Sequence, residues 1–435
     1  MRRRGAGVLA GLAAGLAVLA LALAGSASSA ARSRSDARTA RASGSARAAR
    51  AQRAARTPHA VGGTRALARR SARAKPFELP PVRHIFVIME ENEDYASTFG
   101  EPSADPYLAQ ALPSRGALLS EYFAIGHESN DNYVALVSGQ PPNPENQADC
   151  QLYDNFLDPG TEADGVETGV GCVYPAAIAN IGTQLSAAKK TWKAYEQDMG
   201  NDPDREAAAC GHPALEGKDE TQDAVEGDGY AARHDPFVYF HSVIDDQRYC
   251  DDHVVALGGP NGEMPADALK GETGLATDLK HVSSTPAFSL ITPNLCEDGH
   301  DYPCKNEPSG ASALADIDRF LETWVPKITS SPAFKKNGLL MITFDESDGP
   351  QSDSSSCCEE KPGPASPLPG ITGPGGGRIG AVLLSPFIKP GTVSDVSYNH
   401  YSALASFESL LGLPRLAYAA SVPATFGADV FTAAK

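Results

Sequence analysis

The chain has 435 residues, of which 42% are hydrophobic and 21% charged, a composition typical of a globular protein with one large domain or two smaller ones. Residues 1–75 carry 16 of the 37 basic residues but only one of the 54 acidic residues, so the remainder of the chain is strongly acidic. An acidic body argues against nucleic acid as the main partner, because binding to a phosphate backbone needs clustered Lys and Arg. It suits a soluble exported protein that collects divalent cations.

The first thirty residues are predicted to be a signal peptide. Arg2, Arg3 and Arg4 precede an apolar run at 5–24, and the small residues at 25–30 offer a cleavage site. An uncleaved membrane anchor is the alternative, because the apolar run is nearly long enough to span a bilayer. We therefore expect a protein that is secreted or associated with the cell envelope.

Residues 31–75 consist almost entirely of Ala, Arg, Ser, Gly and Thr. Such a segment has little to bury, so it is predicted to be a disordered linker. Its basic charge favours contact with an anionic wall or membrane surface, and a solvated linker without a partner is the alternative. The folded domain is expected to cover residues 76–435.

Apolar runs and helical patterns alternate along this domain. Helices with regularly spaced apolar residues are predicted at 311–328 and at 401–412, the second ended by Gly412. Buried strands are predicted at 82–89, 286–293, 338–344 and 379–387. The alternation predicts an α/β fold with a largely parallel sheet, in which ligands bind at the carboxyl ends of the strands. Three stretches rich in Gly, Pro and acidic residues, 200–232, 258–275 and 350–377, are expected to be long surface insertions.

Eight cysteines occur, all of them beyond residue 149. An even number behind an export signal predicts disulfides rather than free thiols. Pairing neighbours in sequence order is the simplest arrangement and gives 150–172, 210–250 and 296–304, while Cys357 and Cys358 stay open. A zinc–thiolate site is the alternative, although no Cys-x-x-Cys pair is present.

Polar residues follow two of the predicted strands. Glu91 and Asn92 follow the strand at 82–89, and Asp345 and Glu346 follow the strand at 338–344. Carboxylate and amide oxygens are hard ligands suited to a divalent cation. Acidic groups at two strand ends of one sheet repel each other unless a cation joins them, which favours a metal site over ordinary turns.

Ser129 stands where the segment GHESNDNY (126–133) leads from a loop into a helix. A serine at that place is either a plain N-cap or a nucleophile near the positive end of the helix. If it is the nucleophile, Asn132 would donate a hydrogen bond to a phosphoryl oxygen.

Three histidines lie in polar contexts, where histidine binds metals and moves protons. They are His234, His300 and His400, and Asp298 with His300 forms a plausible ligand pair. A surface or structural role is the alternative for each histidine.

Taken in order, these motifs resemble the bacterial phosphoesterase family that contains phospholipases C and acid phosphatases, within the alkaline phosphatase superfamily. The resemblance covers about residues 80–415. Its segments are HIFVIMEENEDYASTFG (84–100), GHESNDNYVALVSG (126–139), TWKAYEQDM (191–199), HDPFVYF (234–240), ITPNLCEDGHD (291–301), LMITFDESD (340–348), GGGRIGAVLLSPFIKPGT (375–392) and NHYSALASFESLLGL (399–413).

The resemblance implies an alkaline-phosphatase-like sandwich with a central sheet flanked by helices. It implies Ser129 as the nucleophile, Asn132 as its partner in binding the phosphoryl group, and one or two divalent cations (Ca, Mg, Zn, Mn or Fe). The implied metal ligands are Glu91, Asn92, Asp345 and Glu346, with Asp298, His300 and His400.

The nucleophile segment departs from the family pattern. It lacks both of the family's prolines and places Glu128 and Asp131 beside Ser129. The added negative charge opposes anion binding unless a cation compensates.

The expected function is a secreted, metal-dependent phosphoesterase that hydrolyses phosphate monoesters through a phosphoserine intermediate. Its partner would be a small phosphoester or a phospholipid headgroup. One alternative is a phosphodiesterase of the phospholipase C type, which needs exposed apolar surface; the 7% aromatic content, with two Trp, favours the monoesterase. The other is a non-catalytic envelope-associated binding protein on the same fold.

Overall fold

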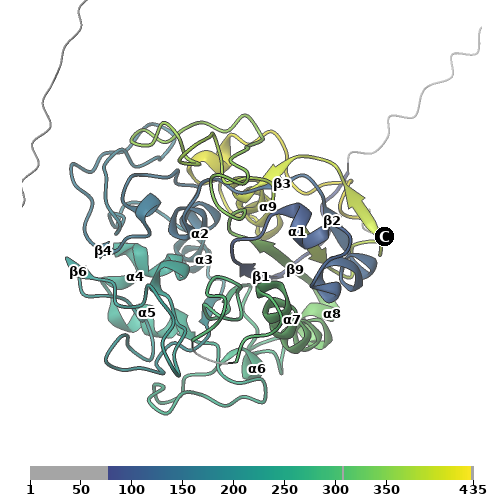
Figure 1. Cartoon of the computed structure of the whole chain (residues 1–435), viewed down its shortest axis with the longest axis horizontal. Helices are drawn as coiled ribbons and strands as arrows, with labels where there is room; N and C mark the ends of the chain where they lie inside the picture. The colour runs from purple at the N-terminus through teal and green to yellow at the C-terminus, as the bar shows by residue number, and fades with distance from the viewer. Residues whose placement is uncertain (1–76, 306–307, 433–435) are drawn as a thin grey trace, which may run out of the picture. The chain divides into compact units, whose positions relative to one another are not determined.

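Eight strands form the central sheet in the computed structural model, which describes residues 77–305 and 308–432 (Figure 1). Their order across the sheet is β11-β2-β10-β9-β1-β8-β5-β7. In chain order they are β1 (His84–Glu90), β2 (Ala117–Leu119), β5 (Trp192–Glu196), β7 (Val254–Ala256), β8 (Phe288–Thr292), β9 (Gly338–Phe344), β10 (Ala381–Leu384) and β11 (Thr392–Ser394). Two further two-stranded sheets pair β12 (Tyr398–Asn399) with β3 (Tyr122–Phe123) and β4 (Leu152–Tyr153) with β6 (Gly217–Lys218).

Most neighbouring strands of the large sheet are parallel. The block β9-β1-β8-β5-β7 is parallel throughout, and β10 runs antiparallel to both β9 and β2. The predicted α/β fold with a largely parallel sheet is therefore confirmed. The predicted strand at 338–344 matches β9, and the runs at 82–89, 286–293 and 379–387 contain most or all of β1, β8 and β10. Because β1 lies between β8 and β9, the carboxyl ends of these three strands meet at one edge.

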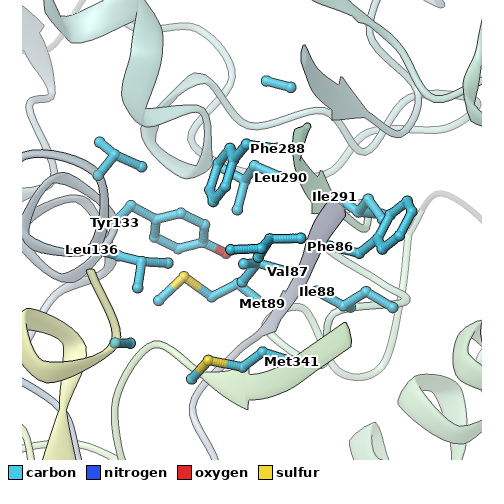
Figure 2. Close-up of a cluster of buried hydrophobic side chains, with 14 of the residues drawn as sticks. Phe86, Val87, Ile88, Met89, Tyr133, Leu136, Phe288, Leu290, Ile291 and Met341 are labelled. Carbon is cyan, nitrogen blue, oxygen red and sulfur yellow. The ribbon is translucent and has the colours of Figure 1, made fainter. Parts of the chain in front are cut away.

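Helices cover both faces of the sheet, which explains why all seven residues of β1 are buried. On one face, Val87 and Met89 of β1 point toward the side on which Tyr133 and Leu136 of α2 (Ser129–Ser138) lie (Figure 2). On the other face, Phe86 packs against Phe334 of α8 (Pro332–Asn337), with ring centroids 6.5 Å apart. The protein thus has the predicted arrangement of a central sheet flanked by helices.

The two predicted helices are present with small shifts at their ends. Helix α7 spans Ala313–Ser330, and Ser312 caps it by accepting a hydrogen bond from the Ala315 N–H. Helix α9 spans His400–Leu411 and ends at Gly412, whose φ of 68° is left-handed and favours glycine. The remaining α-helices are α1 (Tyr95–Phe99), α3 (Ile181–Ala187), α4 (His241–Ile244), α5 (Gln247–His253) and α6 (Leu275–Asp278).

The three predicted insertions contain little regular structure. Disulfides join Cys150 to Cys172, Cys210 to Cys250 and Cys296 to Cys304, which confirms the predicted pairing. A fourth disulfide joins the adjacent Cys357 and Cys358, so the described cysteines leave no thiolate for a zinc site.

No helix within 77–305 and 308–432 is both long and apolar enough to cross a membrane. The predicted signal peptide and linker lie outside the described residues.

Replacement of Leu136 by Ala tests the packing of α2 on the sheet. Leu136 is buried in the main core, so its truncation should lower the free energy of unfolding by about 2–5 kcal/mol. Urea denaturation followed by circular dichroism would measure this loss. The control is Leu157→Ala, because that side chain is 70% exposed and should change stability by about 0.5 kcal/mol or less. Equal losses in both variants would contradict this packing.

Candidate functional site

Three carboxylates converge where β1, β8 and β9 end. Glu91 follows β1 directly, Asp345 follows β9 directly, and Asp298 lies in the loop after β8. All three residues are fully buried. The convergence follows from the position of β1 between its two parallel neighbours, and it brings Glu91 beside two aspartates that are each more than 200 positions away in sequence.

Ser129 faces this cluster from the first turn of α2. Its Oγ donates a hydrogen bond of 2.9 Å to Glu91 Oε2, and the hydroxyl of Tyr133, one turn later, donates one of 2.7 Å to Glu91 Oε1. The N-cap alternative for Ser129 is wrong: the N-cap position belongs to Glu128, which has φ of 80° and whose side chain makes no cap hydrogen bond. Ser129 is instead the first helical residue, with its hydroxyl turned to a carboxylate.

His234 completes a compact group with Glu91 and Asp298. One potential ligand atom from each residue lies within 4.8 Å of the other two. His234 Nδ1 is 3.2 Å from Asp298 Oδ2, and Nε2 is 3.4 Å from Glu91 Oε1. The Tyr133 ring stacks on the imidazole with centroids 5.1 Å apart and planes within 3°. Burial lowers the pKa of His234 well below its usual range, which favours the neutral ring, the form that can bind a metal ion.

The ionisable groups at this site are mostly acidic. Burial raises the pKa values of Glu91, Asp298 and Asp345, and the charges of Asp345 and Asp298 raise the pKa of Glu91 further. Buried carboxylates this close together are costly to ionise without a positive charge between them. The site therefore favours either protons or a cation.

The donor atoms fit a divalent cation. Asp345 Oδ2 and His234 Nε2 are both buried and have no hydrogen-bond partner. Carboxylate oxygens and a neutral imidazole nitrogen are common ligands of divalent transition metals. The cluster of Glu91, His234 and Asp298, with Asp345 beside it, thus has the chemistry to hold the cation that the sequence predicted.

Asn92 and Glu346 occupy neighbouring positions with different partners. The Asn92 N–H donates to Asp345 Oδ1 at 3.1 Å, and its side-chain amide donates to Glu91 Oε2 at 3.4 Å. Glu346 Oε2 accepts from the Glu128 N–H at 3.1 Å and contacts His127 Nδ1. Asn92 therefore joins the two carboxylates, whereas Glu346 contacts the turn that precedes Ser129.

Asn132 is occupied in holding that same turn. Its Oδ1 accepts from the N–H groups of Ile125 and Gly126 at 2.9 and 3.0 Å, and its Nδ2 donates to the carbonyls of Gly126 and Glu128 at 2.9 and 3.2 Å. Both amide hydrogens are engaged, so donation to a phosphoryl oxygen would require one of these bonds to break. Phosphoryl binding by Asn132 stays a prediction, and the structure places it as the residue that shapes the turn.

The two histidines that the resemblance implies as metal ligands have partners on both ring nitrogens. His400 Nε2 lies 2.8 Å from the Asp345 carbonyl oxygen, and its Nδ1 lies 3.0 Å from the Tyr122 hydroxyl. His300 Nδ1 lies 2.8 Å from Asp301 Oδ1, and its Nε2 faces Arg233 at 3.0 Å. Metal binding by His400 or His300 stays a prediction that needs these contacts to rearrange.

Four residues of this site were not among the site residues predicted from the sequence. His234 was noted only as one of three histidines in polar contexts and was not among the implied metal ligands. Tyr133 has a signal in its spacing, because it lies four residues after Ser129 on the same helix face. Arg233 precedes His234, and His127 precedes Ser129 by two residues, but neither spacing points to a partner. Their roles appear only when distant segments pack together.

A buried serine hydroxyl, three carboxylates and a buried imidazole at the carboxyl edge of a largely parallel sheet define a candidate hydrolytic site in an α/β protein. The chain belongs to the Phosphoesterase family, whose model matches residues 102–414. This membership makes it an enzyme of the hydrolase class that acts on phosphoric ester bonds.

Two curated relatives and one solved structure illustrate the similarity. A phosphatidylinositol-3-phosphatase of Mycobacterium tuberculosis is 24% identical over 347 residues, covering 79% of this chain and 82% of the relative. A phosphate-repressible acid phosphatase of Penicillium chrysogenum is 27% identical over 358 residues, but this chain spans only 65% of its length. A protein of the alkaline phosphatase superfamily from Vibrio parahaemolyticus matches with a TM-score of 0.43 and 13% identity, covering 77% of this chain and 68% of that chain.

The fit of the cluster to a cation predicts that His234→Ala lowers metal affinity. The parent protein should retain at least about one divalent cation per chain after desalting, and loss of the imidazole should weaken binding by about tenfold or more. Elemental analysis by mass spectrometry would measure the content across a chelator series. The control is His241→Ala, whose ring pairs with Asp245 and Asn155. Equal metal content in the parent and the His234 variant would contradict the assignment.

Proposed function

We propose that this chain is a secreted, metal-dependent phosphoesterase that hydrolyses phosphate monoesters through a phosphoserine formed on Ser129. The observation that carries the proposal is the hydrogen bond from Ser129 Oγ to Glu91 Oε2, within a buried cluster suited to a cation. A capping serine would not need a carboxylate acceptor, whereas a nucleophile needs a defined destination for its proton.

The chain's own residues orient the nucleophile. Glu91 Oε2 takes the Ser129 hydrogen, which leaves the lone pairs of Oγ free for a phosphorus atom. Tyr133 fixes the other oxygen of Glu91, so the carboxylate holds one orientation. The positive end of α2, at which Ser129 lies, favours the negative charge that develops on Oγ and on the phosphoryl group.

The group that we expect to hold a divalent cation consists of Glu91, His234 and Asp298, with Asp345. When bound, a cation would neutralise part of the carboxylate charge and act as a Lewis acid toward a phosphoryl oxygen.

The reaction would proceed in two displacements at phosphorus. In the first, the bond from Ser129 Oγ to phosphorus forms and the ester P–O bond breaks, while the serine proton passes to Glu91 and from there to the departing alcohol. In the second, water attacks phosphorus and gives one proton to Glu91, and the bond to Oγ breaks. Inorganic phosphate leaves, and Ser129 regains a proton from Glu91.

The names of the relatives support a monoester as the substrate, because both are named as phosphatases. The name of the M. tuberculosis relative also makes a phosphorylated lipid headgroup a candidate substrate for this chain. Export is supported by the four disulfides, which persist in oxidising compartments.

Turnover of p-nitrophenyl phosphate by the purified chain, with and without chelator, tests the proposal. Chelation should abolish the activity, and metal should restore it. Ser129→Ala should lower kcat by about three orders of magnitude or more, because the covalent route is lost while the cluster remains. Bis-p-nitrophenyl phosphate and a water-soluble phosphatidylinositol 3-phosphate in the same assay would separate monoester, diester and lipid headgroup.

Ser138→Ala is the matched control for this variant. Ser138 lies at the other end of α2, is buried, and donates only to the Val134 carbonyl at 2.7 Å. Its activity should stay within about twofold of the parent, because the substitution removes only hydrogen bonds at the far end of the helix and leaves Ser129 and the carboxylate cluster in place. Full activity of Ser129→Ala would eliminate the serine nucleophile, and chelator-resistant activity would eliminate the metal.

A further inference from the structure

Arg233 is unusual among the basic residues that the structure describes. Within 77–305 and 308–432 it is the only Lys or Arg that is buried, at 1% exposure. Charged side chains are almost never fully buried unless a partner compensates the lost hydration. The partners of its guanidinium therefore indicate its role.

The guanidinium is only partly satisfied within the protein. One nitrogen donates to the Gln222 carbonyl at 2.8 Å, and another lies 3.0 Å from His300 Nε2. Nε lies 3.5 Å from Asp149 Oδ2 and has no hydrogen-bond partner. A guanidinium carries five N–H donors, so donors remain without an acceptor. Buried donors without acceptors are costly unless a ligand supplies the acceptor.

Arg233 lies between the two halves of the site. On one side, Asp149 accepts a hydrogen bond of 3.0 Å from the N–H of Asn130, the residue after Ser129, and Asn130 Nδ2 donates to the Arg233 carbonyl at 3.2 Å. On the other side, the N–H of its partner His300 donates to Asp298 Oδ1 at 2.8 Å. The guanidinium is thus linked to the start of the nucleophile helix and to the carboxylate cluster.

The charge around Ser129 creates a need for such a cation. Glu128 and Asp131 flank Ser129, and both Asp131 oxygens are buried without a hydrogen-bond partner. A phosphate dianion that enters this surrounding meets repulsion from several carboxylates. Arginine opposes that repulsion with a fork of donors that matches two phosphoryl oxygens.

We propose that Arg233 is a phosphoryl-binding residue that uses its spare N–H donors to hold non-bridging oxygens beside Ser129. This inference rests on the proposed function in that it assumes a phosphoester substrate, but it does not depend on which atom is the nucleophile. A purely structural Arg233 would neutralise Asp149 and contribute to stability, with no effect on phosphate affinity.

Calorimetric titration with inorganic phosphate separates these roles without turnover. The parent for this test is the full chain carrying Ser129→Ala, in the metal state in which it is purified, so that no covalent adduct forms. Adding Arg233→Met should weaken phosphate binding by about 10- to 100-fold, because charge-assisted hydrogen bonds are lost. Arg205→Met is the control, since Arg205 pairs with Asp228 in the 200–232 insertion. It should leave phosphate affinity within about twofold.

Phosphate affinity that is the same in the parent and in Arg233→Met would overturn the proposal, as would a parent that binds no phosphate. If Arg233→Met does not fold by circular dichroism, Arg233→Lys takes its place. Lysine keeps the positive charge but cannot donate two parallel hydrogen bonds as a guanidinium does, so phosphate affinity should fall by several-fold. Unchanged affinity in this variant would equally overturn the proposal. Failure of the serine mechanism would appear separately, as turnover by Ser129→Ala with phosphate binding intact.

Discussion

The repulsion among three buried carboxylates is the constraint on which the site depends. Glu91, Asp298 and Asp345 lie at one edge of the sheet, out of water, where ionised groups are costly unless opposite charge or hydrogen bonds compensate. The surroundings supply that compensation in several forms. They include the hydroxyl groups of Ser129 and Tyr133 on Glu91 and backbone N–H groups on the two aspartates. The same arrangement that makes the cluster suitable for a cation also fixes the serine hydroxyl.

The second feature that the site needs is a rigid turn before α2. Two side chains hold it: Asn132 bonds to the backbone of 125–128, and Glu346 accepts the Glu128 N–H. His127 connects the turn to the 350–377 insertion through the Asp353 carbonyl at 2.9 Å. The positive φ of Glu128 is the cost of this geometry, since non-glycine residues rarely adopt it. Strain directly before a candidate nucleophile is consistent with a turn built to aim Ser129 at Glu91.

Much of the fold could be predicted from local patterns. The continuous apolar runs identified the core strands β1, β8 and β9 because strands covered by helices on both faces have no polar side. The apolar spacing of α7 and the glycine after α9 were sufficient to place these helices within two residues. Glu91 and Asp345 could be predicted as neighbours because both follow parallel strands, and such strand ends meet at one edge. Three of the disulfides could also be predicted, because each joins two cysteines that are neighbours in sequence order, which is the simplest pairing.

What the sequence by itself determined is the α/β class, the candidate serine and the acidic strand ends, because each is a property of a short segment. The tertiary structure alone decided which partners these residues have. It brought His234 into the cluster with Glu91 and Asp298, placed Arg233 beside it, and engaged the ring nitrogens of His400 with other groups. These contacts join segments separated by tens to hundreds of residues. They depend on the order of the strands in the sheet and on how the loops pack across it. Neither property can be predicted from the spacing of residues within a short segment.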